Sequence, residues 1–148
     1  MNYTELTQAI QDYCENTETT FVNNIPTFVK NAEKFIYHNV RLPALRKNVL
    51  GSTSSSNKYL SVPTDFLSVF EIAAVKTDGT YEFLLPKDVS FIRQNYPDPT
   101  YTALPKYYAL FDKDSFILGP TPDAAYSVEL HYYYYPETIV TSSTTYLG

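Results

Sequence analysis

Two aspartates, Asp112 and Asp114, flank a single lysine in this 148-residue sequence and form a closely spaced pair of carboxylates. A hydrolase can use two carboxylates when both flank a cleft built from rigid elements. This pair falls in a short polar segment between two expected strands, where aspartates commonly bind the turn backbone. We interpret both as turn residues. The segment also lacks the length and the closing glutamate of a calcium-binding loop.

One cysteine, Cys14, and two histidines, His38 and His131, are the remaining candidates for nucleophilic or metal chemistry. A paired cysteine and histidine can attack a substrate, and closely spaced ones can bind zinc. These three lie far apart in the sequence, on two expected helices and one expected strand. We therefore predict no catalytic residue, no metal and no cofactor, and we interpret Cys14 as a buried structural thiol.

Four consecutive tyrosines, residues 132 to 135, suggest a binding surface, because flat aromatic faces stack on sugars and bases. A glycan-binding accessory domain is therefore one hypothesis. Neighbouring strand residues point to opposite faces, however, so the four rings cannot share one platform. The other hypothesis places one face in the core and predicts that Tyr133 and Tyr135 contact a neighbouring subunit.

The composition indicates which elements carry these residues. Fifteen tyrosines, nine phenylalanines and only four glycines favour strands over glycine-rich loops. The net charge of -5 argues against a protein that wraps nucleic acid, because such contacts depend on lysine and arginine. No apolar segment approaches the roughly 20 residues of a membrane-spanning helix. The length suits a single domain, residues 1–148.

The spacing of apolar residues predicts an α+β fold. Residues 1–45 are expected to form a helical hairpin, with one helix over residues 3–15 and a second beginning at Pro26, since proline suits a first turn. Residues 46–148 are expected to be mainly antiparallel strands, as a sheet or sandwich packed beside the hairpin. Asp78-Gly79 marks the tip of a β-hairpin, and residues 87–96 predict one short inserted helix.

The two expected helices carry opposite charge on their outer faces. Residues 1–23 hold four acidic and no basic side chains, whereas residues 24–50 hold five basic and one acidic. One reading is two solvated faces, whose exposed ion pairs contribute under about 1 kcal/mol each. The other is that the acidic face of one copy meets the basic face of the next, a heterologous contact that can close into a ring. The predicted contact residues are Glu5, Asp12, Glu15, Lys30, Lys34 and Arg41.

Six segments in the same order resemble the adaptor, or head-to-tail connector, proteins of short-tailed bacteriophages over almost the whole chain. They are residues 42–48 (LPALRKN), 57–66 (NKYLSVPTDF), 85–99 (LPKDVSFIRQNYPDP), 106–112 (KYYALFD), 115–122 (SFILGPTP) and 128–137 (VELHYYYYPE).

The resemblance implies a structural virion protein that is not an enzyme and binds no membrane. Such adaptors are expected to form a ring of twelve copies beneath the portal protein. The ring provides the platform for the tail nozzle or tube, and DNA passes through its channel without specific binding. The expected location is the neck or tail of the virion, and the host cytoplasm during assembly. In the family the chain continues beyond Tyr146-Leu147-Gly148 into further helices, expected to join a helical bundle and the portal contact.

Overall fold

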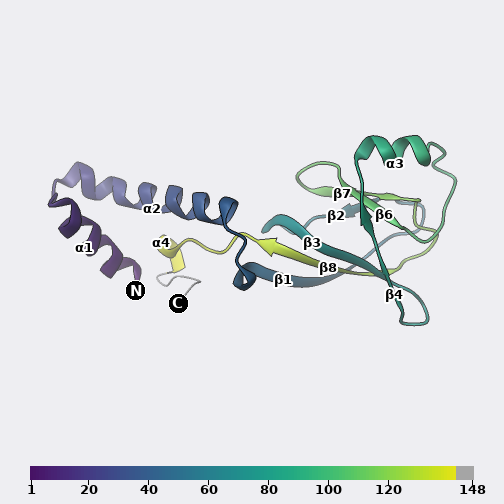
Figure 1. Cartoon of the computed structure of the whole chain (residues 1–148), viewed down its shortest axis with the longest axis horizontal. Helices are drawn as coiled ribbons and strands as arrows, with labels where there is room; N and C mark the ends of the chain where they lie inside the picture. Colours follow the sequence, from purple (N-terminus) through teal and green to yellow (C-terminus); the bar gives the residue numbers. More distant parts are fainter. Residues whose placement is uncertain (143–148) are drawn as a thin grey trace. The chain divides into compact units, whose positions relative to one another are not determined.

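The computed structural model describes residues 1–142, so Tyr146-Leu147-Gly148 lies outside the described residues. Two compact units make up the chain (Figure 1). The first, here called the helical unit, consists of Met1–Leu45 and the described residues from Tyr135 onwards. The second, the sheet unit, is the continuous stretch Arg46–Tyr134. The sheet unit is therefore inserted into the sequence of the helical unit.

Helix α1 (Tyr3–Cys14) begins at a capping box. The Asn2 side chain accepts a hydrogen bond from the Glu5 backbone N–H at 2.9 Å, and the Glu5 carboxylate accepts one from the Asn2 N–H at 2.9 Å. These bonds satisfy two N–H groups that a helix start leaves without partners. The helix ends at Cys14 and is capped by Glu15, which adopts a left-handed conformation with φ 47°. None of the α1 residues is fully buried.

Helix α2 (Thr19–Asn39) contains Pro26 in its interior, so the prediction that this helix begins at Pro26 is wrong. An interior proline removes one helical hydrogen bond and is costly. Packing offsets this cost, because Ile25 is fully buried and Phe21 packs against the same cluster. The turns before Pro26 therefore belong to the packed part of the helix, although their sequence is largely polar.

The helical unit has a small hydrophobic core made by Ile25, Val29 and Ile139. Ile139 begins the short helix α4 (Ile139–Ser142). Its backbone N–H donates to the Glu33 carboxylate at 2.9 Å, and the Thr138 hydroxyl donates to the same carboxylate. This segment lies in the part of the chain predicted to be mainly strands, but it is helical and packs with the other helices.

The first sheet of the sheet unit is antiparallel, with the strand order β1-β8-β3-β4. Its strands are β1 (Arg46–Ser52), β8 (Ser127–Tyr134), β3 (Phe66–Val75) and β4 (Tyr81–Phe83). The predicted hairpin is confirmed, since β3 and β4 pair around a turn that contains Gly79. Gly79 has φ 84°, a left-handed conformation that glycine adopts without steric cost.

The second sheet has the order β2-β7-β6-β5 and is mixed, because β5 and β6 are parallel. Its strands are β2 (Tyr59–Ser61), β7 (Ser115–Gly119), β6 (Tyr107–Leu110) and β5 (Leu85–Pro86). The 3-10 turn η1 (Pro43–Leu45) precedes β1. The inserted helix α3 (Val89–Asn95) covers this sheet (Figure 1). Its residue Ile92 packs against Ala109 and Ile117.

The main core lies between the two sheets. The first sheet contributes Ile72, Ala74, Val128, Leu130, Tyr132 and Tyr134, and Phe116 and Leu118 of β7 face them. Alternate residues of β8 are buried from Val128 to Tyr132, as the period of two predicts for a strand with one face on a core, and Tyr133 and Tyr134 are buried as well. The α+β class, with N-terminal helices, a sheet domain and a short inserted helix, is confirmed.

Candidate interaction surfaces

The paired aspartates serve a turn. The Asp112 carboxylate accepts a hydrogen bond from the Asp114 backbone N–H at 2.8 Å. This bond, followed by one from the Ser115 side chain, lowers the pKa of Asp112 below its usual value. Both aspartates are exposed and stand in the connection between β6 and β7. The interpretation of the pair as turn residues is confirmed.

The cysteine and histidines stand in separate environments. Cys14 is exposed, so its interpretation as a buried thiol is wrong. Cys14 is the last residue of α1 and follows Tyr13, which is 92% exposed. Both are exposed because the packed face of this helix ends at Ile10. Nδ1 of His38 lies 2.8 Å from the Lys34 carbonyl oxygen on α2, whereas His131 belongs to β8.

Neither a metal cluster nor a membrane span occurs in the part of the chain that the structure describes. Across residues 1–142, no three histidine, cysteine, aspartate or glutamate side chains are grouped so that they could hold a metal ion. No helix in the same range is both long enough and apolar enough to cross a membrane.

The four tyrosines do not form an exposed row. Tyr132, Tyr133 and Tyr134 are 3%, 6% and 3% exposed, which removes the basis for a glycan platform on this strand. Tyr133 lies beneath Arg46, whose Nη2 donates to the tyrosine hydroxyl at 3.1 Å. Tyr135 is half-buried and contacts Tyr37 edge-on. A contact of Tyr133 or Tyr135 with a neighbouring protein stays a prediction.

The charged residues of the two helical faces are all exposed. They are Glu5, Asp12 and Glu15 in and after α1, and Lys30, Lys34 and Arg41 in and after α2. Within residues 1–142, none of these six forms an ion pair with another side chain of the chain. Both charged faces are therefore available to a partner.

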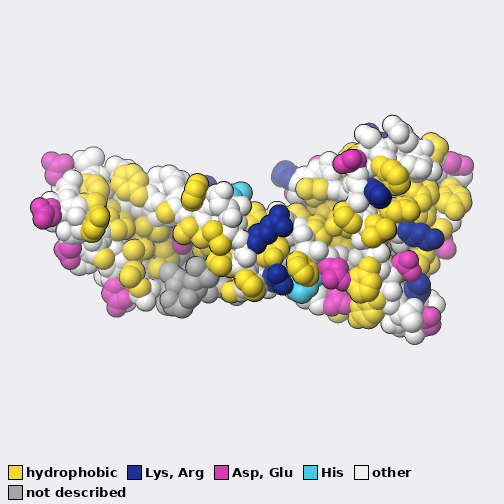
Figure 2. All heavy atoms as spheres, viewed as in Figure 1, with side chains coloured by type: hydrophobic (Ala, Val, Ile, Leu, Met, Phe, Trp, Pro, Cys, Tyr) yellow, Lys and Arg dark blue, Asp and Glu magenta, His cyan; other side chains and the backbone are white. Residues whose placement is uncertain are grey.

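Helix α2 also exposes large apolar side chains. Phe28, Phe35, Ile36 and Val40 are 51%, 70%, 39% and 44% exposed. Phe28 and Ile36 line a groove of about 370 Å³ together with Leu6, Ile10, Val29 and Ile139. Hydrophobic side chains are accordingly prominent on the visible face of the helical unit (Figure 2). Contiguous apolar surface of this kind marks contacts with other proteins.

The family model of the SU10 adaptor protein matches residues 1–147. The chain belongs to the SU10 adaptor family. The resemblance to phage adaptors is thereby confirmed, and the protein is a bacteriophage adaptor, a structural component of the virion. Membership in this structural family implies a non-enzymatic role. A search of curated proteins finds no match to the adaptor.

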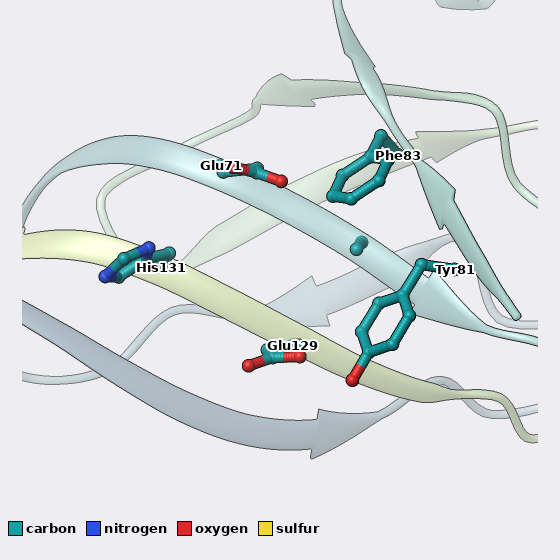
Figure 3. A pocket seen from close by; sticks show the side chains of 6 residues that line it. Glu71, Tyr81, Phe83, Glu129 and His131 are labelled. Carbon is teal, nitrogen blue, oxygen red and sulfur yellow. The ribbon is translucent and has the colours of Figure 1, made fainter. Parts of the chain in front are cut away.

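The adaptor has a further hollow that sequence reasoning missed. It lies on the face of the first sheet opposite the main core and measures about 220 Å³ (Figure 3). Its lining side chains come from three strands: Glu71, Ala73, Tyr81, Phe83, Glu129 and His131. Each of the three strands contributes two of these residues, and the period of two predicts that both face away from the core. Only the register of the strands brings the three sets together.

An ionised pair within the sheet unit of the adaptor links β1 to the core. Asp65 accepts hydrogen bonds from Lys47 at 2.6 Å and from the Tyr132 hydroxyl at 2.8 Å. Burial would raise the pKa of Asp65, but the bonds from Lys47 and Tyr132 outweigh it and hold the pKa below its usual value. Burial, and then the bond to Asp65, raises the pKa of Tyr132 to about 12.

These shifts predict how Tyr132→Phe changes the pH dependence of stability. A tyrosine whose pKa is raised on folding stabilises the protein fully below pH 10, and this contribution is lost as the pH rises towards 12. The variant should lose about 1–2 kcal/mol of unfolding free energy at pH 7, through the missing hydrogen bond. Between pH 10 and pH 11.5 the variant should lose less unfolding free energy than the parent protein. Urea unfolding at pH 7, pH 10 and pH 11.5 measures these values. Equal losses in the two proteins between pH 10 and pH 11.5 would contradict the assignment.

Proposed function

We propose that the adaptor assembles into a closed ring, expected to hold twelve copies, through its helical units. The observation that carries this proposal is the contrast between the small core of the helical unit and the exposed apolar residues of α2. The core cluster holds Ile25, Val29 and Ile139, whereas Phe28 and Phe35 are more than half exposed. A helix usually derives most of its stability from a packed apolar face. Contact with a neighbouring copy would cover this face.

Charge supports a head-to-tail contact in the proposed ring. The acidic residues Glu5, Asp12 and Glu15 of one copy would face Lys30, Lys34 and Arg41 of the next. Contacts between two different surfaces of the same chain close into rings when the rotation permits. Complementary charges fix which surfaces meet, and they matter more for specificity and rate than for affinity. The apolar groove would supply the affinity.

The proposed ring binds the portal protein on one side and provides the platform for the tail nozzle or tube on the other. Tyr133 and Tyr135 are proposed contacts with a neighbour or with the tail protein. DNA would pass through the ring, and the net charge of -5 favours passage without strong binding, because phosphates are held mainly by lysine and arginine. The proposed location is the virion neck, with assembly in the host cytoplasm.

Charge reversal tests the ring. The variant Lys30→Glu/Lys34→Glu should weaken assembly at least about tenfold, because two acidic faces would then meet. Mass photometry of the adaptor, alone and with its portal protein, measures the number of copies in each complex. Lys113→Glu, which reverses an exposed charge in the turn between β6 and β7, is the matched control.

A second variant makes this test specific for a head-to-tail ring. Glu5→Lys/Asp12→Lys/Glu15→Lys should also fail to assemble, since two basic faces would meet. An equimolar mixture of the two variants should form rings again, because alternating copies restore every acidic-to-basic contact in a ring with an even number of subunits. Unchanged assembly of either variant alone would remove the helical faces from the interface.

A further inference from the structure

The hollow on the outer face of the first sheet arises from one small residue among larger ones. Ala73 of β3 pairs with Phe83 of β4 on one side and with Glu129 of β8 on the other. Glu71, two residues earlier on β3, pairs with His131. Ala73 has the smallest side chain among the lining residues, and the longer side chains around it, labelled in Figure 3, form the rim.

Aromatic rings form one wall of this hollow. The rings of Tyr81 and Phe83 are stacked, with centroids 6.3 Å apart and planes inclined by 19°. Both side chains are more than half exposed, at 52% and 57%. Two exposed aromatic faces on an edge strand are unfavourable in water, and their negative faces attract cations.

Two carboxylates complete the hollow, and no lysine or arginine lines it. Glu71 and Glu129 form no ion pair with any side chain in residues 1–142. The Asn48 amide donates a hydrogen bond to Glu129. Interaction with Glu129 also raises the pKa of Tyr81. The bond from Asn48 holds the Glu129 carboxylate at the rim without neutralising its charge.

Cations elsewhere on this sheet are engaged by other groups. Arg46 lies 4.2 Å above the centroid of the Phe70 ring, and Lys76 pairs with Glu82 at 2.7 Å. The hollow is therefore an aromatic-walled pocket whose two carboxylates form no ion pair with a lysine or arginine of the described residues.

We propose that this pocket receives the side chain of an arginine presented by another virion protein. A planar guanidinium stacks on aromatic rings and donates forked hydrogen bonds to carboxylates. Glu71 and Glu129 occupy diagonal positions of neighbouring strands, roughly 7–8 Å apart, which a guanidinium can bridge. The volume of about 220 Å³ lies below the range of roughly 300–1,000 Å³ typical for small-molecule pockets, and it suits one side chain.

The arginine comes from a different protein because the arginines of this chain have other roles. The sequence holds three: Arg46 lies over Phe70, Arg93 lies over Phe111, and Arg41 belongs to the charged face proposed for the ring. The pocket belongs to the sheet unit, and it needs no ring. Binding of an arginine by the pocket therefore stands or fails separately from the ring, whereas the choice of a different protein as the partner rests on the ring contact proposed for Arg41.

An NMR titration with N-acetyl-arginine amide tests the pocket. The ring signals of His131, Tyr81 and Phe83 should shift in a saturable manner, whereas N-acetyl-citrulline amide, which has the same shape without the charge, should bind at least about tenfold more weakly. N-acetyl-lysine amide should lie between them. Equal binding of the citrulline and arginine probes, or shifts located elsewhere on the protein, would overturn the proposal.

Variants assign the binding to the two carboxylates. Glu71→Gln/Glu129→Gln keeps the size of both side chains and should weaken binding of the arginine probe at least about tenfold. Glu18→Gln, an exposed carboxylate in the helical unit, should leave it unchanged. Unaltered binding by the double variant would overturn the proposal. If the NMR signals of the pocket shift as the adaptor concentration rises, and this shift is absent in Arg41→Gln, then Arg41 of a second copy occupies the pocket. That result would overturn the choice of a different protein as the partner.

Discussion

Phe116→Ala is expected to lower the unfolding free energy of the sheet unit by about 3–5 kcal/mol, the usual cost of deleting a buried aromatic ring. Phe116 is fully buried between the two sheets. Its ring meets Phe66 and Tyr108 edge-on, at centroid distances of 5.5 Å and 5.9 Å. The surrounding strands hold these neighbours in place, so the cavity cannot collapse. Urea unfolding followed by the near-ultraviolet signal of the tyrosines measures the loss.

A surface variant in the same unit provides the control for Phe116. Leu50 of β1 is 70% exposed, and Leu50→Ala should change stability by less than about 0.5 kcal/mol. A comparable loss in both variants would show that burial between the sheets does not determine the stability of this unit.

Ile25→Ala is expected to have the largest effect on the helical unit. Ile25 is fully buried and belongs to a core cluster of three residues, so its removal should cost about 2–5 kcal/mol. Because the helical and sheet units have separate cores, the far-ultraviolet helical signal should disappear at a temperature at which the sheet unit remains folded. The variant should also fail to form the proposed ring.

Phe35→Ala distinguishes packing inside the helical unit from contacts outside it. Phe35 lies on the same helix and is 70% exposed, so its truncation should leave the unfolding of the isolated adaptor nearly unchanged. If Ile25→Ala melts both units together, the two cores are not energetically separate, and this prediction is wrong.

The strands were predictable wherever a local pattern sufficed. Asp78-Gly79 between two β-rich segments predicts a hairpin, because such a turn needs left-handed conformations that glycine supplies. The alternation along β8 correctly predicts that Val128, Leu130 and Tyr132 are buried. Both signals depend on residues close in sequence, and no distant contact is needed to interpret them.

The errors concern residues whose state depends on distant contacts. The amphipathic pattern of α1 shows that Cys14 shares a side with Ile10, but it does not show where the covering helix ends. Pro26 resembles a helix start, and only the burial of Ile25 explains why the helix continues through it. In the same way, no local signal indicates that Glu33 binds the start of α4.

The candidate surfaces were predictable in part. Blocks of acidic and basic residues are visible in the sequence, and the structure places the six predicted contact residues on the surface. The aromatic pocket was missed because Glu129 and His131 are distant in sequence from Glu71 and Tyr81, which belong to the predicted hairpin. The four residues come together through the pairing of β3 with β8, and pairing between distant strands is set by the whole fold.

The insertion of the sheet unit has a consequence for engineering and for the exchange of genes between phages. Its first residue, Arg46, pairs with Tyr133, next to its last residue, so the chain enters and leaves this unit through adjacent strands. One uninterrupted piece of coding sequence therefore specifies a module whose two ends are neighbours. Such a cassette can be replaced by another domain with neighbouring ends while the flanking helices keep their own sequence.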